Sequence, residues 1–179
     1  FKMITASNTI LDQMDNADLP DNLKNQYRGE ARFLRAFGYF NLVRLFGDVP
    51  IVTHAFNSPK EIQEFDMTRQ SVDKVYQIII DDLTNAANDL QNVNGVSKSR
   101  ASAGAARALL GKVYLTLHNF QNAANVLSDL IGSGKYSLQS DYGTLFTNNN
   151  DNLPETIFEI DYLSGNLGLG NSYSSIFTP

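Results

Sequence analysis

Residues 29–50 read GEARFLRAFGYFNLVRLFGDVP, the most clearly periodic stretch of the chain. Apolar residues recur there at spacings of three and four, which is the repeat of an α-helix with a buried face. The stripe comprises Tyr27, Ala31, Leu34, Gly38, Leu42 and Leu45, and it is widened by Phe33, Phe37, Phe40 and Val43. A helix with so wide an apolar surface should be buried on more than one side.

Capping and breaking residues mark the ends of this helix. Asp18 is a suitable N-terminal cap, and Pro20 suits a first helical turn. Gly47 is a typical helix stop, after which Asp48-Val49-Pro50 leads into an extended connection. We therefore expect a helix that begins near residue 18 and ends at Phe46.

Other parts of the chain show the same helical periodicity. It predicts helices at residues 1–14, 72–90, 102–117 and 119–131. Ser102 should cap one of these helices, and His118 should cap a helix end. Gly132-Ser133-Gly134 should terminate the last of them.

The remaining segments lack helical periodicity. Residues 53–67 are polar and predict a long surface loop, whereas residues 155–162 are strand-like and predict a single strand. The expected fold class is mainly α, built from helical hairpins, with a short β- and loop-rich part near the C-terminus. We expect a helical region at 1–146 and a loop and strand segment at 147–179 that further sequence would complete.

Composition excludes several functional classes. The net charge is -5 and neither sign forms a long block, so there is no electrostatic footprint for nucleic acid. The chain contains no Cys, which removes disulfides, thiolate nucleophiles and cysteine metal ligands. The longest apolar runs, such as Ile78-Ile79-Ile80, are far shorter than the roughly 20 residues of a membrane span. The N-terminal residues resemble no leader, so we expect any targeting segment to lie outside this sequence.

Residues 102–131 predict a tight helical hairpin whose spacing matches the tetratricopeptide (TPR) pattern. Leu110, Gly111 and Tyr114 fall at the leucine, glycine and tyrosine positions of that repeat, and Ala123 and Leu127 at its later small and apolar positions. Small residues at such positions let two helices approach closely. An ordinary helical hairpin remains the alternative.

The stretch at 29–50 also resembles the long signature helix of the SusD/RagB family, including its glycine-to-proline exit. Further matches follow in family order: Asp81-Asp82-Leu83, then 105–117, then 119–131 with the exit Gly134-Lys135-Tyr136-Ser137-Leu138, then Glu155-Thr156-Ile157-Phe158-Glu159-Ile160. The ordered series spans nearly the whole chain. Family members are much longer, so we expect this chain to be a fragment.

The resemblance implies a TPR-like superhelix within a non-enzymatic lipoprotein of the outer membrane. Such proteins capture glycans or other oligomeric nutrients, sit over a TonB-dependent, SusC-like transporter and need no cofactor. The family's sugar-stacking aromatics usually come from loops outside the matched segments, so no binding residue carries over. The absence of Trp agrees with this, because sugar platforms favour the largest aromatic faces.

The loop that contains His54, Phe56 and Asn57 has the minimal chemistry for contacting a sugar, an aromatic ring among polar groups. These residues are our glycan-binding candidates. Local packing of Phe56 is the alternative explanation.

Three acidic residues, Glu155, Glu159 and Asp161, share one face of the predicted strand. Glu159 and Asp161 would lie roughly 6.6 Å apart along it, within the range of an inverting glycosidase. An acidic outer face on a half-buried strand is the commoner arrangement, so we expect no catalytic residue. The alternative functions are a generic TPR-like protein-interaction scaffold and, less favoured, a glycoside hydrolase.

Metal and phosphate sites are not expected. Asn148, Asn150 and Asn152 alternate like calcium ligands, but Leu153 stands where that loop requires Gly. Two histidines are too few for a three-histidine site. Glycines within 165–170 lack the Lys-Ser or Lys-Thr pair of a phosphate loop.

The signature helix also carries basic residues, Arg28, Arg32, Arg35 and Arg44, of which the first three are brought together by helical spacing. Because the helix should be buried, we expect these arginines to pair internally, with Glu30 and Asp48, rather than to face a partner.

Overall fold

The computed structural model describes residues 1–146 and 153–161. Over these ranges the regular elements are α1 (Lys2–Met14), α2 (Asp21–Phe46), α3 (Pro59–Glu64), α4 (Val72–Asp89), α5 (Ala103–Thr116), α6 (Phe120–Gly132) and the 3-10 helix η1 (Tyr142–Phe146). The mainly α fold class is confirmed, and the long helices begin and end within a few residues of the predicted positions.

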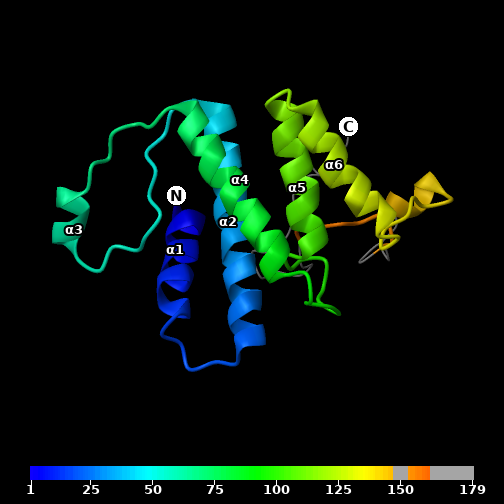
Figure 1. The fold of residues 1–179 in the computed structure, drawn as a ribbon, viewed down its shortest axis with the longest axis horizontal. Coiled ribbons are helices and arrows are strands. Elements are labelled where there is room, and N and C mark those ends of the chain that lie inside the picture. Colours follow the sequence, from blue (N-terminus) through cyan, green and yellow to red (C-terminus); the bar gives the residue numbers. More distant parts are fainter. Residues whose placement is uncertain (147–152, 162–179) are drawn as a thin grey trace, which may run out of the picture.

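The long helices pack side by side in chain order (Figure 1). α1 and α4 both pack on α2, α5 packs on α4, and α6 packs on α5. Each helix therefore contacts its sequence neighbour in the bundle, as in helical repeats. Away from the bundle lie α3, at the left of Figure 1, and η1, at its right.

Two glycines let neighbouring helices approach α2 closely. A Cβ atom on Gly29 would lie 2.6 Å from Cγ of Leu90, and one on Gly38 would lie 3.0 Å from Cγ1 of Ile4. Bulkier side chains fill the rest of the core. The largest fully buried apolar ones are Tyr39, Phe33, Phe40, Ile4, Ile79, Leu83, Leu90, Val75 and Val113. The expectation that α2 is buried on more than one side is confirmed.

The α5–α6 hairpin shows the close approach predicted from its sequence. A Cβ atom on Gly111 would lie 2.5 Å from Cδ2 of Leu127, so the glycine accommodates the leucine side chain. Ala123 is also buried. Small residues at these positions are therefore required by packing between the two helices.

Helix ends follow local chemistry, with two differences from expectation. Gly47 ends α2 with a φ of 67°, a left-handed conformation that favours glycine. Ser102 caps α5 as expected, because its side chain accepts a hydrogen bond from the Ala105 N–H. Asp18 does not cap α2; Pro20 occupies the cap position and makes no side-chain bond.

The expectation that His118 caps a helix end is also wrong. Asn119 caps α6, and its side chain accepts from the N–H of Asn122. His118 instead has a φ of 56° and forms the turn between α5 and α6. Asn119 is the better cap because its short amide reaches the first free N–H groups of the helix.

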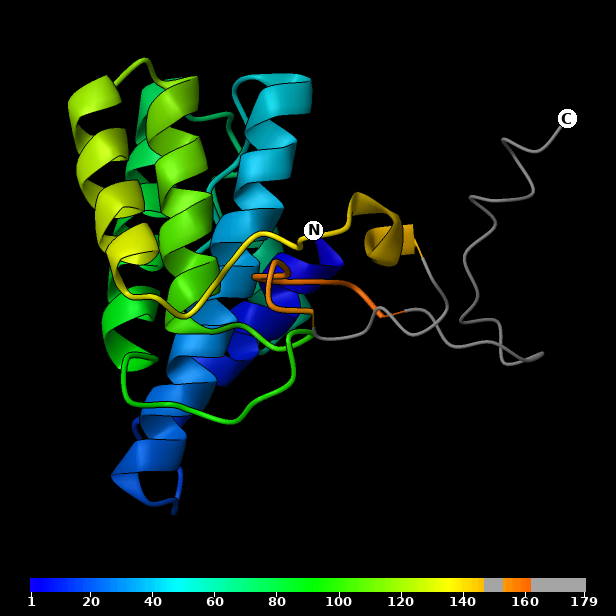
Figure 2. The same ribbon diagram turned by 90° about the vertical axis from the view of Figure 1, so that its right-hand side faces the viewer.

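The predicted strand at 155–162 does not form over its described residues, 155–161. Instead of a ladder, the backbone makes single hydrogen bonds to different segments. The Glu159 N–H donates to the Lys98 carbonyl, and the carbonyl of Pro154, just before this range, accepts from the Ser137 N–H. Figure 2 shows this segment, in orange, crossing the helices. The Phe158 ring meets the Phe33 ring edge-on at 5.0 Å, so its apolar residues pack on α2 rather than in a sheet.

Candidate functional site

Residues 49–70 form an arm that leaves the bundle after α2 and returns before α4. Val49 and Gln70 form an isolated antiparallel bridge in which the Gln70 N–H donates to the Val49 carbonyl at 3.0 Å. Beside it, the carboxylate of Asp48 accepts from the N–H of Val72 at 3.0 Å. Both ends of the arm are therefore fixed at one point on the bundle.

The surface loop predicted at 53–67 is mostly exposed, but it contains a short helix that its sequence did not lead us to expect. The hydroxyl of Ser58 accepts from the Glu61 N–H, and the Glu61 carboxylate accepts from the Asn57 N–H. Pro59 occupies the first turn of α3. Ser58 and Glu61 have the spacing of a capping box, but Glu61 accepts from the N–H of the residue before the cap rather than from that of Ser58.

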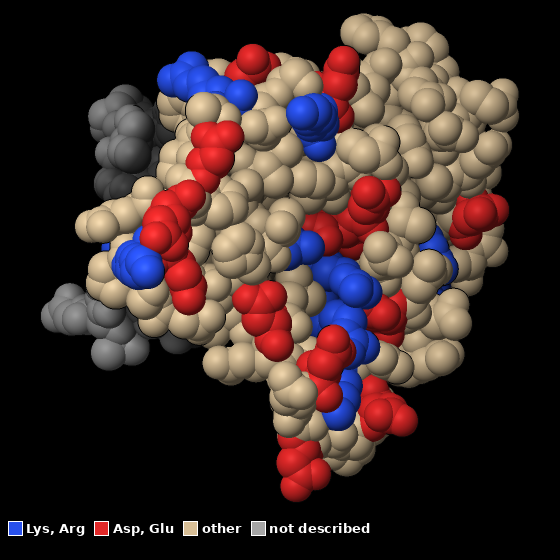
Figure 3. Space-filling view, turned by 60° about the vertical axis from the view of Figure 1, so that its left-hand side comes forward, with Lys and Arg blue, Asp and Glu red and all other residues tan. Residues whose placement is uncertain are grey.

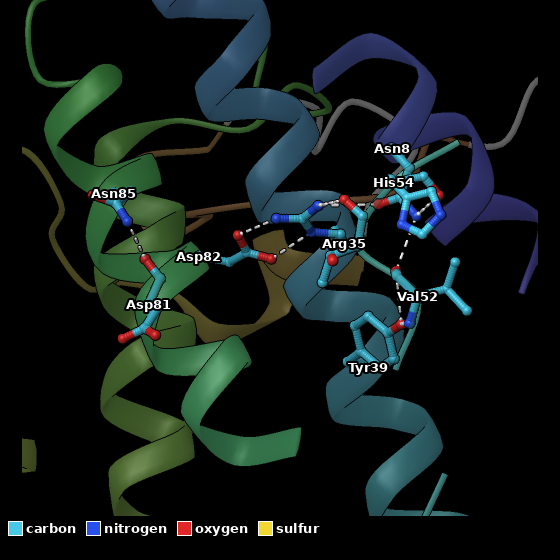
Figure 4. A network of polar contacts seen from close by, with 9 residues as sticks. Asn8, Arg35, Tyr39, Val52, His54, Asp81, Asp82 and Asn85 are labelled. Atoms are coloured by element: carbon cyan, nitrogen blue, oxygen red, sulfur yellow. Dashed lines mark hydrogen bonds and ion pairs between the residues drawn. The ribbon is translucent and has the colours of Figure 1, made fainter. Parts of the chain in front are cut away.

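A polar network holds the root of the arm against α1 and α2 (Figure 4). The side-chain amide of Asn8 donates to the carbonyls of Val52 and His54, at 2.9 and 3.0 Å. The hydroxyl of Tyr39 donates to the Val52 carbonyl at 3.0 Å and accepts from the Val52 N–H at 2.7 Å. Asn8 and Tyr39 therefore fix the backbone immediately before and at His54.

Arg35 connects this network to α4. Its guanidinium donates two bonds of 2.8 Å to the two carboxylate oxygens of Asp82. It also donates to the Asn8 side-chain oxygen and to the Thr53 carbonyl. The side chains of Arg35 and Asp82 are only 11% and 7% exposed, so this pair is largely removed from water.

Burial raises the pKa of Tyr39 above its ordinary value. The Val52 hydrogen bond and the positive charge of Arg35 oppose this shift, and the charge of Asp82 adds to it. The Tyr39 hydroxyl therefore remains protonated near neutral pH and serves Val52 as both donor and acceptor.

Beyond the network, three rings meet at the base of α3. His54, Phe56 and Phe65 contact one another edge-to-face, with centroid separations of 5.0, 5.2 and 5.3 Å. His54 is exposed, whereas Phe56 and Phe65 are partly buried. The structure thus brings two of the sequence candidates together and adds Phe65, which the sequence analysis did not select.

The third candidate, Asn57, is exposed, and its backbone N–H belongs to the α3 cap. The arm therefore presents an aromatic cluster with an exposed amide side chain beside it. Rings of this kind supply faces on which an apolar sugar surface can stack.

Internal pairing of the α2 arginines is confirmed, with other partners than expected: Arg28–Asp15, Arg32–Asp89 and Arg35–Asp82. Glu30 instead binds Arg100, and Asp48 caps α4. Figure 3 shows basic side chains in a column with acidic ones on both sides, so this face carries no extended patch of one sign. Arg44 lies over the Phe40 ring at 4.2 Å.

The acidic residues near the C-terminus do not line up on a strand. The Glu155 carboxylate accepts from the backbone N–H of Gln139 at 2.8 Å, which ties two loops together. Within the described residues, no cluster of three or more His, Cys, Asp and Glu side chains could hold a metal ion. The asparagines at 148, 150 and 152 and the glycines within 165–170 lie outside the described residues.

The helical bundle defines the class of protein: consecutive helical hairpins that support a projecting arm. Residues 1–115 match the sequence model of a SusD-like family described as starch-binding and associating with the outer membrane. The chain belongs to the SusD-like family, as its resemblance to SusD/RagB proteins implied.

Individual relatives agree with this assignment. SusD-like protein P2 of Formosa agariphila is 32% identical over 99% of this chain and 36% of its own length. A SusD superfamily protein from Bacteroides thetaiotaomicron has a TM-score of 0.82 and 26% identity, over 97% of this chain and 39% of that one. A laminarin-binding SusD-like protein has a TM-score of 0.76 and 31% identity, over 87% of this chain and 34% of that one.

The chain thus spans about a third of the length of these relatives. Among the helices of residues 1–146 and 153–161, none has the length and apolarity that crossing a membrane requires.

Proposed function

We propose that the protein captures glycans or other oligomeric nutrients at the outer-membrane surface, does not cleave them, and delivers them to a TonB-dependent, SusC-like transporter. The observation that carries the proposal is the family match over residues 1–115, whose description names starch binding and the outer membrane. The similarity to a laminarin-binding structure supports the same ligand class. A lipid anchor outside these residues would hold the protein at the membrane.

Within this chain, the arm is the proposed place of sugar contact. His54 and Asn57 are exposed there, beside the partly buried ring of Phe56. The network of Asn8 and Tyr39 fixes the backbone that carries these side chains, so they need little ordering when a ligand binds. In this proposal, residues 1–146 form the helical scaffold and residues 147–179 form a separate segment.

A protein-interaction scaffold is the second candidate. Its support is the TPR-like hairpin, in which Gly111 closes onto Leu127. Such a scaffold would bind an extended peptide or protein surface and would show no preference among sugars.

The test is calorimetry with starch, laminarin and other oligosaccharides on the 179-residue chain and on the complete gene product. We expect the gene product to bind at least one oligosaccharide, and this chain to bind it more weakly. Chromatography of the incubated sugars should show no products. The laminarin-binding relative serves as the positive control.

Two results would contradict the proposal. Sugar cleavage that is abolished by Glu159→Gln would show an enzyme. Absence of binding to every oligosaccharide by the gene product, with peptide binding retained, would favour the interaction scaffold.

A further inference from the structure

A cavity of about 160 Å³ lies where the α4–α5 connection, the first turns of α5 and the segment after α6 meet. Its lining includes Ser97, Gly104, Arg107, Lys135 and Tyr136. It is separate from the arm, which joins the opposite end of α4. Neither the family match nor the proposed sugar contact assigns it a role.

The lining of this cavity is basic. It includes Lys98, Arg100, Arg107 and Lys135, and none of its residues, all within the described ranges, is acidic. Lys98 donates to two backbone carbonyls, and Arg100 is paired with Glu30. Within the described part of the chain, the side chains of Arg107 and Lys135 have no ion pair or hydrogen bond. Two uncompensated cations thus share one cavity in a protein of net charge -5.

Tyr136 adds a neutral donor to the same cavity. A Cβ atom on Gly104 would lie 2.0 Å from the Tyr136 hydroxyl oxygen, so only glycine lets this hydroxyl lie against the first turn of α5. Among the described residues, the Tyr136 hydroxyl has no hydrogen-bond partner. Every buried polar side-chain atom of these residues does have a partner, so the hydroxyl is not among the buried atoms. The Tyr136 hydroxyl is therefore open to the cavity and able to donate to a ligand.

We propose that this cavity binds an oxyanion, a sulfate or a carboxylate, through Arg107, Lys135 and the Tyr136 hydroxyl. The planar guanidinium of Arg107 matches two oxygens of such a group, and Lys135 supplies a second positive charge. The volume suits one anionic group and not a sugar chain. The group is either a free ion or a substituent on an acidic sugar.

The experiment is an NMR titration of the 179-residue protein at constant ionic strength, with sodium chloride as the balancing salt. The ligands are sodium sulfate, sodium glucuronate, glucose 6-sulfate and neutral glucose. We expect saturable shifts of the amides at 102–107 and 133–136 with the anions and none with glucose. Equal affinity for sulfate and glucose 6-sulfate would indicate a free-ion site, and tighter binding of the sugar sulfate a substituent site.

Arg107→Gln should weaken anion binding by about tenfold or more, because it removes a charge-assisted hydrogen-bond donor. Arg69→Gln is the matched control, since Arg69 is exposed, unpaired among the described residues and at the other end of α4. Arg69→Gln should leave affinity unchanged. Equal losses in both variants, equal binding of glucose, or no saturable shift with any anion would each overturn the proposal.

Folding of the variants is checked by thermal unfolding in chloride alone. Arg107→Gln should not lower the unfolding midpoint, because it removes a charge with no partner in the described structure. Tyr136→Phe keeps the ring packed on Gly104 and removes only the hydroxyl, so it should weaken anion binding by a smaller factor than Arg107→Gln.

Discussion

Arg35 and Asp82 meet face to face, with the Nε and Nη2 atoms of the arginine each 2.8 Å from one carboxylate oxygen. The pair joins α2 to α4, and the remaining Arg35 nitrogen reaches Asn8 in α1 and the Thr53 carbonyl in the arm. One side chain thus links four separate segments. Because both side chains are largely buried, removing either one would leave the charge of the other buried without a partner.

Asp82→Asn should therefore destabilise the protein by roughly 3 to 5 kcal/mol, measured as the free energy of unfolding in urea. The double variant Arg35→Met with Asp82→Leu should cost less than the two single changes together, because it leaves no buried charge. Asp15→Asn, in the exposed Arg28–Asp15 pair, is the control and should change stability by less than about 1 kcal/mol. Equal effects at Asp82 and Asp15 would contradict this account.

Gly111→Leu should destabilise the protein by roughly 1 to 3 kcal/mol through overpacking against Leu127. The matched control is Gly132→Ala at the end of α6, where an added Cβ meets no atom within 4 Å. That change should stabilise by up to about 1 kcal/mol from helix propensity. Both free energies come from urea unfolding, and a gain in stability from Gly111→Leu would show that this face is not packed.

Because of Tyr39, the free energy of unfolding should vary with pH in the alkaline range. Its folded-state pKa is raised, chiefly by burial, so the folded protein holds this proton more tightly than the unfolded chain. The resulting stability is complete below about pH 10, the ordinary tyrosine pKa, and is lost as pH rises through the raised value. Tyr39→Phe should make the alkaline decline in unfolding free energy shallower.

The same substitution should also cost roughly 1 to 3 kcal/mol at neutral pH, because the buried N–H of Val52 loses its partner, although the Val52 carbonyl keeps its bond from Asn8. Tyr76→Phe should change the alkaline slope in the same direction, since burial also raises the pKa of Tyr76. Urea unfolding between pH 7 and 11 measures both effects. If the alkaline slope is unchanged in Tyr39→Phe, the alkaline loss of stability does not come from the raised pKa of Tyr39.

The long helices were predictable from sequence because their signals are local. Apolar spacing within α2 and α4 and end signals such as Ser102 and Gly47 act within a few residues. α3 was missed because a helix of only 6 residues with no buried side chain shows no apolar period. Its local signals were Pro59 in the first turn and the capping-box spacing of Ser58 and Glu61.

The site could be predicted only in part, because its contacts join distant residues. Arg35 lies 47 positions from Asp82 and 27 from Asn8, and nothing in sequence spacing links them. Phe65 stands alone in a polar segment, so its contact with Phe56 depends on the fold of the arm. The apolar residues near 155–160 indicated burial correctly, but their packing on α2 replaced the strand pairing that their composition favoured.

Phe56→Ala in the complete gene product should weaken binding of its best oligosaccharide by about five- to tenfold, because losing one aromatic face removes about 1 kcal/mol. Phe120→Ala is the matched control. Phe120 also meets a histidine ring edge-on, that of His118, but it stands at the start of α6, which lies on the other side of the bundle from α3 (Figure 1). Its loss should leave sugar affinity unchanged.

Phe65→Ala tests whether Phe65 contacts the sugar itself or only packs against the rings that do. Phe65 packs against both His54 and Phe56, so its removal should loosen the cluster and weaken binding by less than Phe56→Ala. Calorimetry measures affinity in all three variants, and circular dichroism verifies that each stays helical. Equal losses from Phe56→Ala and Phe120→Ala, or full affinity in Phe56→Ala, would place the sugar contact outside the arm.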